Sequence, residues 1–178
     1  MDRTGKVIVD TTKSAHARLH PVAVDAVRLR DTIWEPRRRM TIDATIPGQY
    51  QLLETTERLE NFRRTARGES GNFSGRYYND SDVYKWIEAA SWALAPEPNP
   101  ELDALLDDVI ATIGSAQQPD GYIDNFYTLG DMSKQWTELT VTHELYCAGH
   151  LFQAAVAHHR ATGKTTLLDI SCSFPDLI

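Results

Sequence analysis

The chain has 178 residues, of which 42% are hydrophobic and 24% are charged, and its formal net charge at pH 7 is −7. This composition is typical of a folded globular domain and excludes a disordered chain. The negative charge disfavours binding to nucleic acid or to an anionic membrane, because it repels phosphate groups.

Cysteine content and the N-terminal sequence bear on the compartment. The two cysteines, Cys147 and Cys172, form neither a zinc-finger spacing nor a disulfide pattern, which suits a reducing environment. Met1 is not followed by an apolar run of signal-peptide length, and no run approaches the ~18 apolar residues of a membrane span. We interpret the basic cluster at residues 37–39 as a solvated helix face. We therefore expect a cytoplasmic protein with no nucleic-acid or membrane partner.

The N-terminal segment, residues 1–30, is expected to be extended. Residues 7–10 read VIVD and can form a short strand. Apolar and polar residues alternate within residues 22–29, and this pattern predicts an edge or capping strand.

Helical patterns begin after this segment. Pro36 suits the first position of a helix, and apolar spacing predicts that this helix runs to Pro47. A second helical pattern runs from Tyr50 to Phe62. Residues 63–74 are polar and include two glycines, so we predict a loop there.

Two helices with clear ends follow. Asp80 or Ser81 is expected to cap the first helix, whose apolar stripe is Val83, Trp86, Ile87, Ala90 and Leu94. Asn99 is expected to cap the second helix, with Pro100 at its first position. The stripe of the second helix is Leu102, Leu105, Leu106, Val109, Ile110 and Ile113.

The longest predicted helix runs from Thr140 to Gly163. Thr140 or Thr142 can accept a backbone N–H at its start, and Gly163 suits the left-handed residue that ends a helix. Arg160 lies in its last turn, where a cation suits the helix dipole. The predicted apolar stripe is Leu145, Gly149, Phe152 and Val156, widened by Ala148, Leu151 and Ala155. Its many alanines predict close approach by another helix.

The order of helices and loops indicates stacked helical hairpins whose alternate loops open onto a common face. A non-helical segment, residues 118–127, precedes the longest helix. A last helix begins at residue 165 and is interrupted by Pro175. Because this helix has hardly begun to bury a face, we expect the chain to be a truncated part of a larger domain.

Three blocks of sequence carry a family resemblance. Residues 79–90 read NDSDVYKWIEAA, residues 116–124 read AQQPDGYID, and residues 143–163 read HELYCAGHLFQAAVAHHRATG. In this order and with these gaps they resemble the N-terminal part of glycoside hydrolase family 127 (GH127), the β-L-arabinofuranosidases. Shorter upstream matches extend the resemblance to roughly residues 22–171.

The resemblance implies a mainly α fold. Residues 31–178 would form the N-terminal part of an (α/α)6 catalytic toroid, which in the family precedes β-sandwich domains. The active site would lie in the mouth of the toroid. The resemblance also implies a retaining reaction that releases L-arabinofuranose from β-linked glycans.

The resemblance further implies a zinc ion in the full-length family. A cysteine thiolate, held on this zinc by further cysteines and a glutamate, would be the nucleophile, and another glutamate the general acid/base. Those residues lie downstream of this chain in the family, and Cys147 does not occupy a ligand position. We expect no metal ligand and no catalytic residue in this chain, and no activity from the chain alone.

His143 is the residue that the resemblance places at the sugar, as a hydrogen-bonding partner in the −1 subsite. From the residues alone, a structural pair at a helix N-terminus is the favoured interpretation of His143 and Glu144, and the resemblance reverses this preference. A zinc protease is excluded, because Cys147 replaces the second histidine of the His-Glu-x-x-His motif. His150 is interpreted as a core histidine with a hydrogen-bond acceptor.

Two further residues are candidates for sugar contact. Asp82, like its neighbour Asp80, can accept hydrogen bonds from sugar hydroxyls or can simply cap a helix. Trp136, together with the Tyr122 loop, can offer a stacking surface for a sugar ring, whereas Trp86 lies on an apolar stripe and is expected in the core.

The expected partner is an oligosaccharide or glycan substrate, and a homodimer is one assembly that the full-length protein could form. The alternative function is a non-catalytic carbohydrate-binding module or helical scaffold, which would keep the helices without the chemistry.

Overall fold

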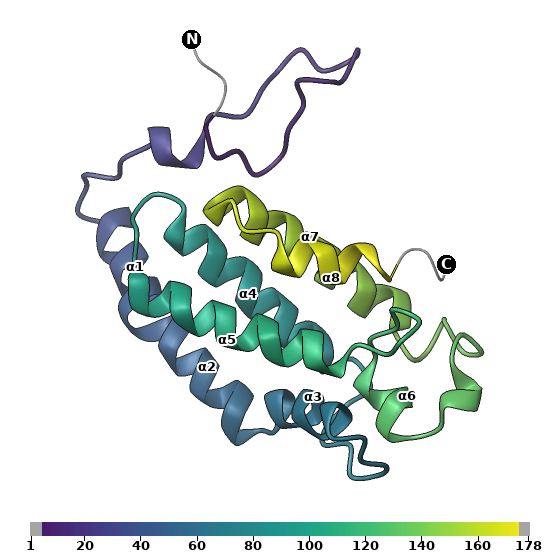
Figure 1. Cartoon of the computed structure of the whole chain (residues 1–178). Coiled ribbons are helices and arrows are strands. Elements are labelled where there is room, and N and C mark those ends of the chain that lie inside the picture. The colour runs from purple at the N-terminus through teal and green to yellow at the C-terminus, as the bar shows by residue number, and fades with distance from the viewer. Residues whose placement is uncertain (1–4, 175–178) are drawn as a thin grey trace.

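The computed structural model describes residues 5–174, and all regular structure in them is helical (Figure 1). The predicted mainly α class is therefore confirmed. None of these helices is long and apolar enough to cross a membrane.

The two predicted N-terminal strands are not formed. Val24–Ala26 is a single turn of 3-10 helix, η1, and the apolar side chains around it face solvent, with Val22 69% exposed. Alternation predicts a strand only where one face can be buried, and here no sheet offers that face. Arg160 instead fastens the segment by donating to the carbonyl oxygens of Val7 and Ile8, at 3.3 and 2.6 Å.

The first helical region is continuous across Pro47. Helix α1, Trp34–Met40, passes through a π-helical turn, η2, Thr41–Thr45, into α2, Ile46–Thr55. The predicted end of the helix at Pro47 is wrong. Pro47 lies in the first turn of α2, directly after the widened turn, where its missing N–H and its ring are tolerated.

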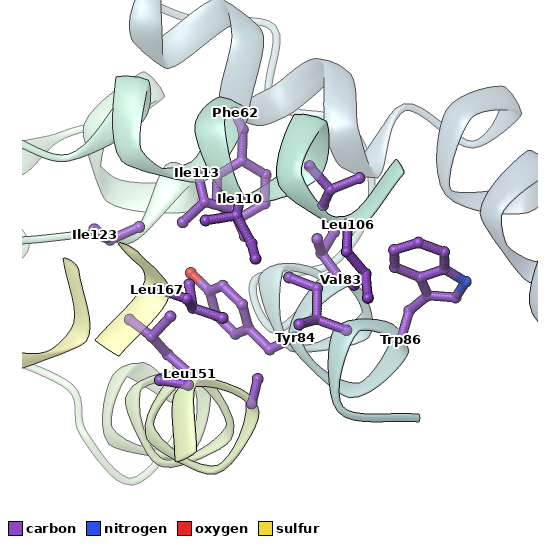
Figure 2. Close-up of a cluster of buried hydrophobic side chains, with 14 of the residues drawn as sticks. Phe62, Val83, Tyr84, Trp86, Leu106, Ile110, Ile113, Ile123, Leu151 and Leu167 are labelled. Atoms are coloured by element: carbon purple, nitrogen blue, oxygen red, sulfur yellow. The ribbon is translucent and has the colours of Figure 1, made fainter. Parts of the chain in front are cut away.

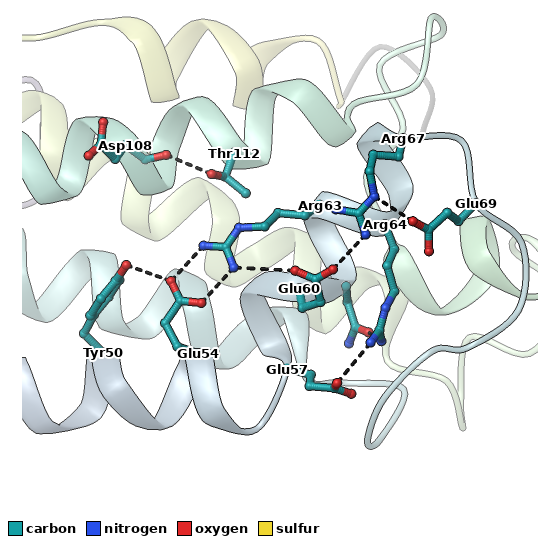
Figure 3. A network of polar contacts seen from close by, with 11 residues as sticks. Tyr50, Glu54, Glu57, Glu60, Arg63, Arg64, Arg67, Glu69, Asp108 and Thr112 are labelled. Carbon is teal, nitrogen blue, oxygen red and sulfur yellow. Dashed lines mark hydrogen bonds and ion pairs between the residues drawn. The ribbon is translucent and has the colours of Figure 1, made fainter.

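Helix α3, Arg58–Ala66, is separated from α2 by Glu57, which has a left-handed backbone with φ of 62°. The predicted loop therefore begins later than residue 63, since the arginines at its start lie in α3. Their guanidinium groups bind glutamates on both sides, and Arg63 bridges to Glu54 with two contacts of 2.7 Å (Figure 3). Charge pairing explains how so polar a segment is helical.

Helices α4, Asp80–Leu94, and α5, Pro100–Ala116, match their predicted stripes. Asn99 caps α5 by accepting from the Leu102 N–H at 3.1 Å, as predicted. The predicted side-chain cap on α4 is absent, and Asp80 points elsewhere, into the buried interior.

The last part of the chain contains α6, Asn125–Leu129, the 3-10 turn η3, Met132–Lys134, α7, Glu144–Thr162, and α8, Thr166–Cys172. Helix α7 begins after both threonines that were predicted to cap it, and the Thr142 hydroxyl donates to the Glu138 carbonyl. Gly163 ends α7 with a φ of 81°, as predicted. The interruption predicted at Pro175 lies outside the described residues.

The buried face of α7 matches the predicted stripe only in part. Leu145 and Val156, at the centre of that stripe, are 43% and 38% exposed, whereas the residues predicted to widen it, Ala148, Leu151 and Ala155, are buried. The small residues of the buried face let α4 and α8 pack closely against α7: Cys147, Ala148, Ala154, Ala155 and Ala157. Close approach through small residues was thus predicted correctly, although the centre of the stripe was not.

One hydrophobic core connects these helices. It is formed by side chains of α3, α4, α5, α7 and α8 (Figure 2). Fully buried members include Phe62, Tyr84, Ile110, Leu151 and Leu167. The core fixes the N-terminal ends of α4 and α7 beside each other, and the candidate site lies at these ends.

Candidate functional site

His143 stands immediately before α7 with a left-handed backbone, φ 61° and ψ 24°. A residue with a Cβ in this conformation is strained by about 1–3 kcal/mol, so the surrounding structure must hold it there. Its ring Nδ1 lies 2.7 Å from the Val141 carbonyl oxygen, and its own carbonyl accepts from the Cys147 N–H, which makes the first main-chain hydrogen bond of the helix.

Three tyrosines surround the His143 ring. Its centroid lies 5.3, 5.8 and 5.4 Å from those of Tyr77, Tyr78 and Tyr146. Tyr77 and Tyr78 precede α4, and Tyr146 lies in the first turn of α7. The N-terminal ends of both helices therefore contribute to the site. We call these four residues, with His150, the His143 cluster.

The His143 cluster is open to solvent on one side, with Tyr78 and Tyr146 exposed by 36% and 44%. Lys85 donates from Nζ to the Tyr146 hydroxyl at 2.7 Å and lies 4.9 Å from its ring centroid. The cluster therefore combines apolar ring surface with polar hydrogen-bonding groups. Sites for small polar ligands such as sugars have this character.

His150 lies one helical turn beyond Tyr146, with ring centroids 4.6 Å apart. Its Nδ1 is buried and finds no hydrogen-bond partner among residues 5–174. The acceptor that we expected for this histidine is thus not present at Nδ1. Burial, followed by repulsion from Lys85, lowers the pKa of His150, so its imidazole is neutral at pH 7.

Glu144 holds the start of α7 in place through buried hydrogen bonds. Its carboxylate is almost fully buried, at 1% exposure, and accepts from the Tyr122 hydroxyl at 2.7 Å and from the Trp136 backbone N–H at 3.1 Å. Burial, with help from nearby carboxylates, raises the pKa of Tyr122, so this hydroxyl stays a donor. Through these two contacts Glu144, the residue directly after His143, ties the segment between α5 and α7 to the start of α7.

A second buried carboxylate holds α6 in place. Asp80, at the first position of α4, accepts from the backbone N–H and the side-chain amide of Asn125, at 2.8 and 2.9 Å. Burial raises the pKa of Asp80 to about 6 and also raises that of its neighbour Asp124. Asp80 therefore acts inside the protein, neither as a helix cap nor at the surface.

Asp82 lies apart from His143, in a hollow of about 550 Å³ between α2 and α4. Its carboxylate pairs with Arg58 Nε at 3.3 Å. Lys85 also lines this hollow, and since Lys85 contacts Tyr146, the hollow adjoins the His143 cluster. The predicted sugar contact of Asp82 stays a prediction.

The Trp136 ring packs inward. It stands edge-on to Tyr122 and Phe174, with centroid distances of 5.4 and 5.9 Å. Tyr122 itself is fully buried, so its loop does not offer the exposed stacking surface that we expected. Trp86 is a core residue, as predicted. Two exposed rings, Tyr78 and Tyr146, belong to the His143 cluster, and Trp34 on α1 is exposed as well. No periodicity in the sequence indicates the cluster, because Tyr77 and Tyr78 lie in a loop.

The two cysteines do not fit the zinc centre that the resemblance implies. That centre needs several cysteines, and this chain has two. Cys147 is buried, and burial raises the pKa of its thiol, whereas Cys172 is exposed on α8. Within residues 5–174, the side chains close enough together to hold a metal are those of Asp103, Asp107 and His158.

Known proteins share this fold and sequence. The family profile for the β-L-arabinofuranosidase GH127 catalytic domain matches residues 26–178. A non-reducing end β-L-arabinofuranosidase of Bifidobacterium longum is 33% identical, and the match covers 85% of this chain and 27% of that protein.

Two solved structures agree. A GH127 β-L-arabinofuranosidase from Geobacillus stearothermophilus T6 is 44% identical with a TM-score of 0.81, over 84% of this chain and 25% of that one. A second GH127 β-arabinofuranosidase is 34% identical with a TM-score of 0.83, over 88% and 26%. The chain thus spans about a quarter of the length of these relatives. The predicted family is confirmed: this chain belongs to the GH127 β-L-arabinofuranosidase catalytic-domain family.

Proposed function

We propose that this chain forms the sugar-binding front of a GH127 glycosidase that releases L-arabinofuranose from β-linked glycans with retention. The observation that carries this proposal is the His143 cluster, a histidine held in a strained conformation among three tyrosines, two of them exposed. Strained residues persist where the fold over-determines them, and they are concentrated at ligand sites. The names of the similar proteins support the sugar and its linkage.

The helices would take their place in an (α/α)6 toroid. Support comes from the antiparallel α4 and α5, joined by a short turn, and from α7 and α8 beside them (Figure 1). In such a toroid the loops before α4 and α7 would line one common mouth. Those loops carry His143, Tyr77 and Tyr78 of the His143 cluster, so the proposed architecture and the proposed site agree.

His143 would bind a sugar hydroxyl through Nε2. Its Nδ1 is directed at the Val141 carbonyl, which fixes the proton on Nδ1 and leaves the Nε2 lone pair as an acceptor. The Tyr146 hydroxyl already accepts from Lys85, so its own proton is free to be donated. An acceptor and a donor side by side match a pair of adjacent sugar hydroxyls.

Bond cleavage by the expected mechanism would need a zinc centre with several cysteines, and this chain has two. We derive no step through zinc, which stays an expectation for the full-length family. The chain alone is accordingly expected to bind sugar without turning it over.

Sugar binding is tested by titrating the ¹⁵N-labelled chain with methyl β-L-arabinofuranoside and following amide shifts by NMR. We expect saturable shifts near His143 with millimolar sugar, and their loss in His143→Ala. Asp108→Asn is the control and should leave the shifts unchanged, because Asp108 is exposed on α5, outside the loops before α4 and α7. Shifts that persist unchanged in His143→Ala would refute the assigned site.

Catalysis is tested with p-nitrophenyl β-L-arabinofuranoside on the chain alone and on a chimera in which the chain replaces the matching quarter of the Geobacillus enzyme. We expect turnover by the chimera and none by the chain. Turnover by the chain alone would show that the chemistry lies within these residues. Sugar binding with an inactive but folded chimera would favour the alternative, a carbohydrate-binding module.

A further inference from the structure

A second group of polar side chains lies at the opposite end of α7 from His143. Asp103 and Asp107 stand one turn apart on α5, and His158 is in the last turns of α7. One carboxylate oxygen of each aspartate and one ring nitrogen of His158 all lie within 4.8 Å of one another. The 15 residues of helix from His143 to His158 separate this group from the His143 cluster by about 22 Å.

His158 is the unusual member of this group. Its side chain is buried, at 1% exposure, yet neither ring nitrogen has a hydrogen-bond partner among the described residues. Buried polar atoms are nearly always paired, so two unpaired nitrogens on one ring call for a reason. Burial, followed by repulsion from Lys164, lowers the pKa of His158, which leaves the imidazole neutral and able to ligate.

In this structure the Lys164 ammonium lies between the two aspartates and pairs with both. Its Nζ lies 2.7 Å from Asp103 Oδ1 and 2.7 Å from Asp107 Oδ2. The side chains of Asp103 and Asp107 are 38% and 51% exposed, and that of Lys164 is 33% exposed. All three can therefore change rotamer without disturbing the core.

We propose that Asp103, Asp107 and His158 bind a divalent transition-metal ion of the Zn²⁺ class, with the Lys164 ammonium moving out as the ion enters. Two carboxylate oxygens and one imidazole nitrogen, completed by water, make a four-coordinate set that suits zinc. Zinc bonds of about 2 Å bring such ligands to about 3.3 Å apart, so the group must contract slightly from its present spacing.

The ligand set also selects against the common hard cations. Ca²⁺ takes six to eight oxygen ligands and Mg²⁺ keeps much of its water, so neither gains from a buried imidazole. The ion would clamp the start of α5 to the end of α7. It is distinct from the zinc–cysteine centre of the family, because no cysteine belongs to this group.

The test is competition for Zn²⁺ between the 178-residue chain and a fluorescent zinc indicator. The key variant is Asp107→Asn, and its matched control is Asp108→Asn, the neighbouring exposed aspartate on the same helix. We expect Asp107→Asn to weaken binding by about 10-fold or more, by analogy with the 10–100-fold losses caused by weaker second-shell changes. Asp108→Asn should leave binding unchanged.

Lys164→Met removes the competing cation and keeps the apolar stem. Part-exposed ion pairs are weak, so freeing the two aspartates is expected to tighten Zn²⁺ binding by about 3- to 30-fold. Millimolar Ca²⁺ should not compete. In wild-type chain, Zn²⁺ should also shift the ring NMR signals of His158, assigned by comparison with His158→Gln.

The proposal is overturned if the chain binds no Zn²⁺ below millimolar concentration, or if Asp107→Asn and Asp108→Asn bind it equally. It is also overturned if Lys164→Met binds no tighter than wild type, or if the His158 ring signals do not move. Because Asp107 and Lys164 are partly exposed, their variants are expected to fold, and far-UV circular dichroism checks this.

Discussion

Glu144 offers a sharp test of how the candidate site is supported, through the substitution Glu144→Gln. The side chain keeps its shape but loses its charge. Its two hydrogen-bond partners, the Tyr122 hydroxyl and the Trp136 N–H, then meet a neutral acceptor. The new amide group has to be buried as well, at a position that is 1% exposed.

The cost follows from the contacts. A hydrogen bond to a charged group contributes about 1.5–3 kcal/mol and a neutral one about 0.5–1.5, so two weakened bonds lose about 2 kcal/mol. Glu144 also lies in the first turn of α7, where a negative charge contributes about 0.3–1 kcal/mol. The expected loss of unfolding free energy is about 2–3 kcal/mol. With a urea m-value of about 2 kcal/mol/M, the midpoint falls by about 1–1.5 M.

The control is Glu101→Gln. Glu101 occupies the first turn of α5 but is exposed, so it loses the dipole contribution alone. Urea unfolding of both variants, followed by far-UV circular dichroism, separates the two contributions. Equal midpoints for Glu144→Gln and Glu101→Gln would refute the view that the buried carboxylate holds the start of α7. In a Tyr122→Phe background, the cost of Glu144→Gln should fall by about 1 kcal/mol.

Three further outcomes are expected. Gly149→Ala should stabilise the chain by about 0.5–1 kcal/mol, because a Cβ there meets no atom within 4 Å; a lower melting temperature would contradict this. Asn99→Ala should cost about 1 kcal/mol in urea unfolding through loss of the cap on Leu102, and no change would exclude that cap as a stabilising contact. Burial raises the pKa of Asp80 to about 6, from about 3.9 unfolded, so its protonation stabilises the fold fully below pH 4 and this contribution is lost as pH rises through 6. Asp80→Asn has no titrating proton at this position, so its unfolding free energy relative to wild type should rise between pH 4 and pH 7, by up to about 3 kcal/mol. Urea unfolding at each pH measures this difference, and a constant difference would refute the shift in pKa.

The helix pattern in the sequence was informative where capping and periodicity agreed. Asn99 with Pro100, and the stripe of α5, predict that helix closely. The stripe of α7 was centred too far to one side, on Leu145 and Val156, because the buried alanines and Cys147 carry less hydrophobic surface than these two residues. Small residues fit this face because α4 packs close against it. The distance between two helices is a tertiary property, which the periodicity of one helix does not encode.

The candidate site could be predicted only in part. The family blocks indicated His143, and the structure places it among tyrosines. Trp136 was chosen for its ring, yet its position is set by a backbone hydrogen bond to Glu144 and by the core that its ring joins. Asp82 was chosen for its carboxylate, which pairs with Arg58 and is still 38% exposed, so its sugar contact stays a prediction. Residue type indicates what a side chain can do, whereas its surroundings in the fold are set by long-range contacts.

The position of the His143 ring depends on its neighbours in the chain, Val141 and Glu144. Its left-handed backbone is kept by a short chain of contacts, in which Glu144 fixes the next residue and the Val141 carbonyl fixes the ring. The strain of about 1–3 kcal/mol is comparable to the contribution of one such contact, so the contacts hold the conformation with a margin only when they act together. Loss of the buried carboxylate should therefore disorder the His143 ring before it unfolds the helix bundle. In this fold, the stability of the site is a property of the buried residues beneath it.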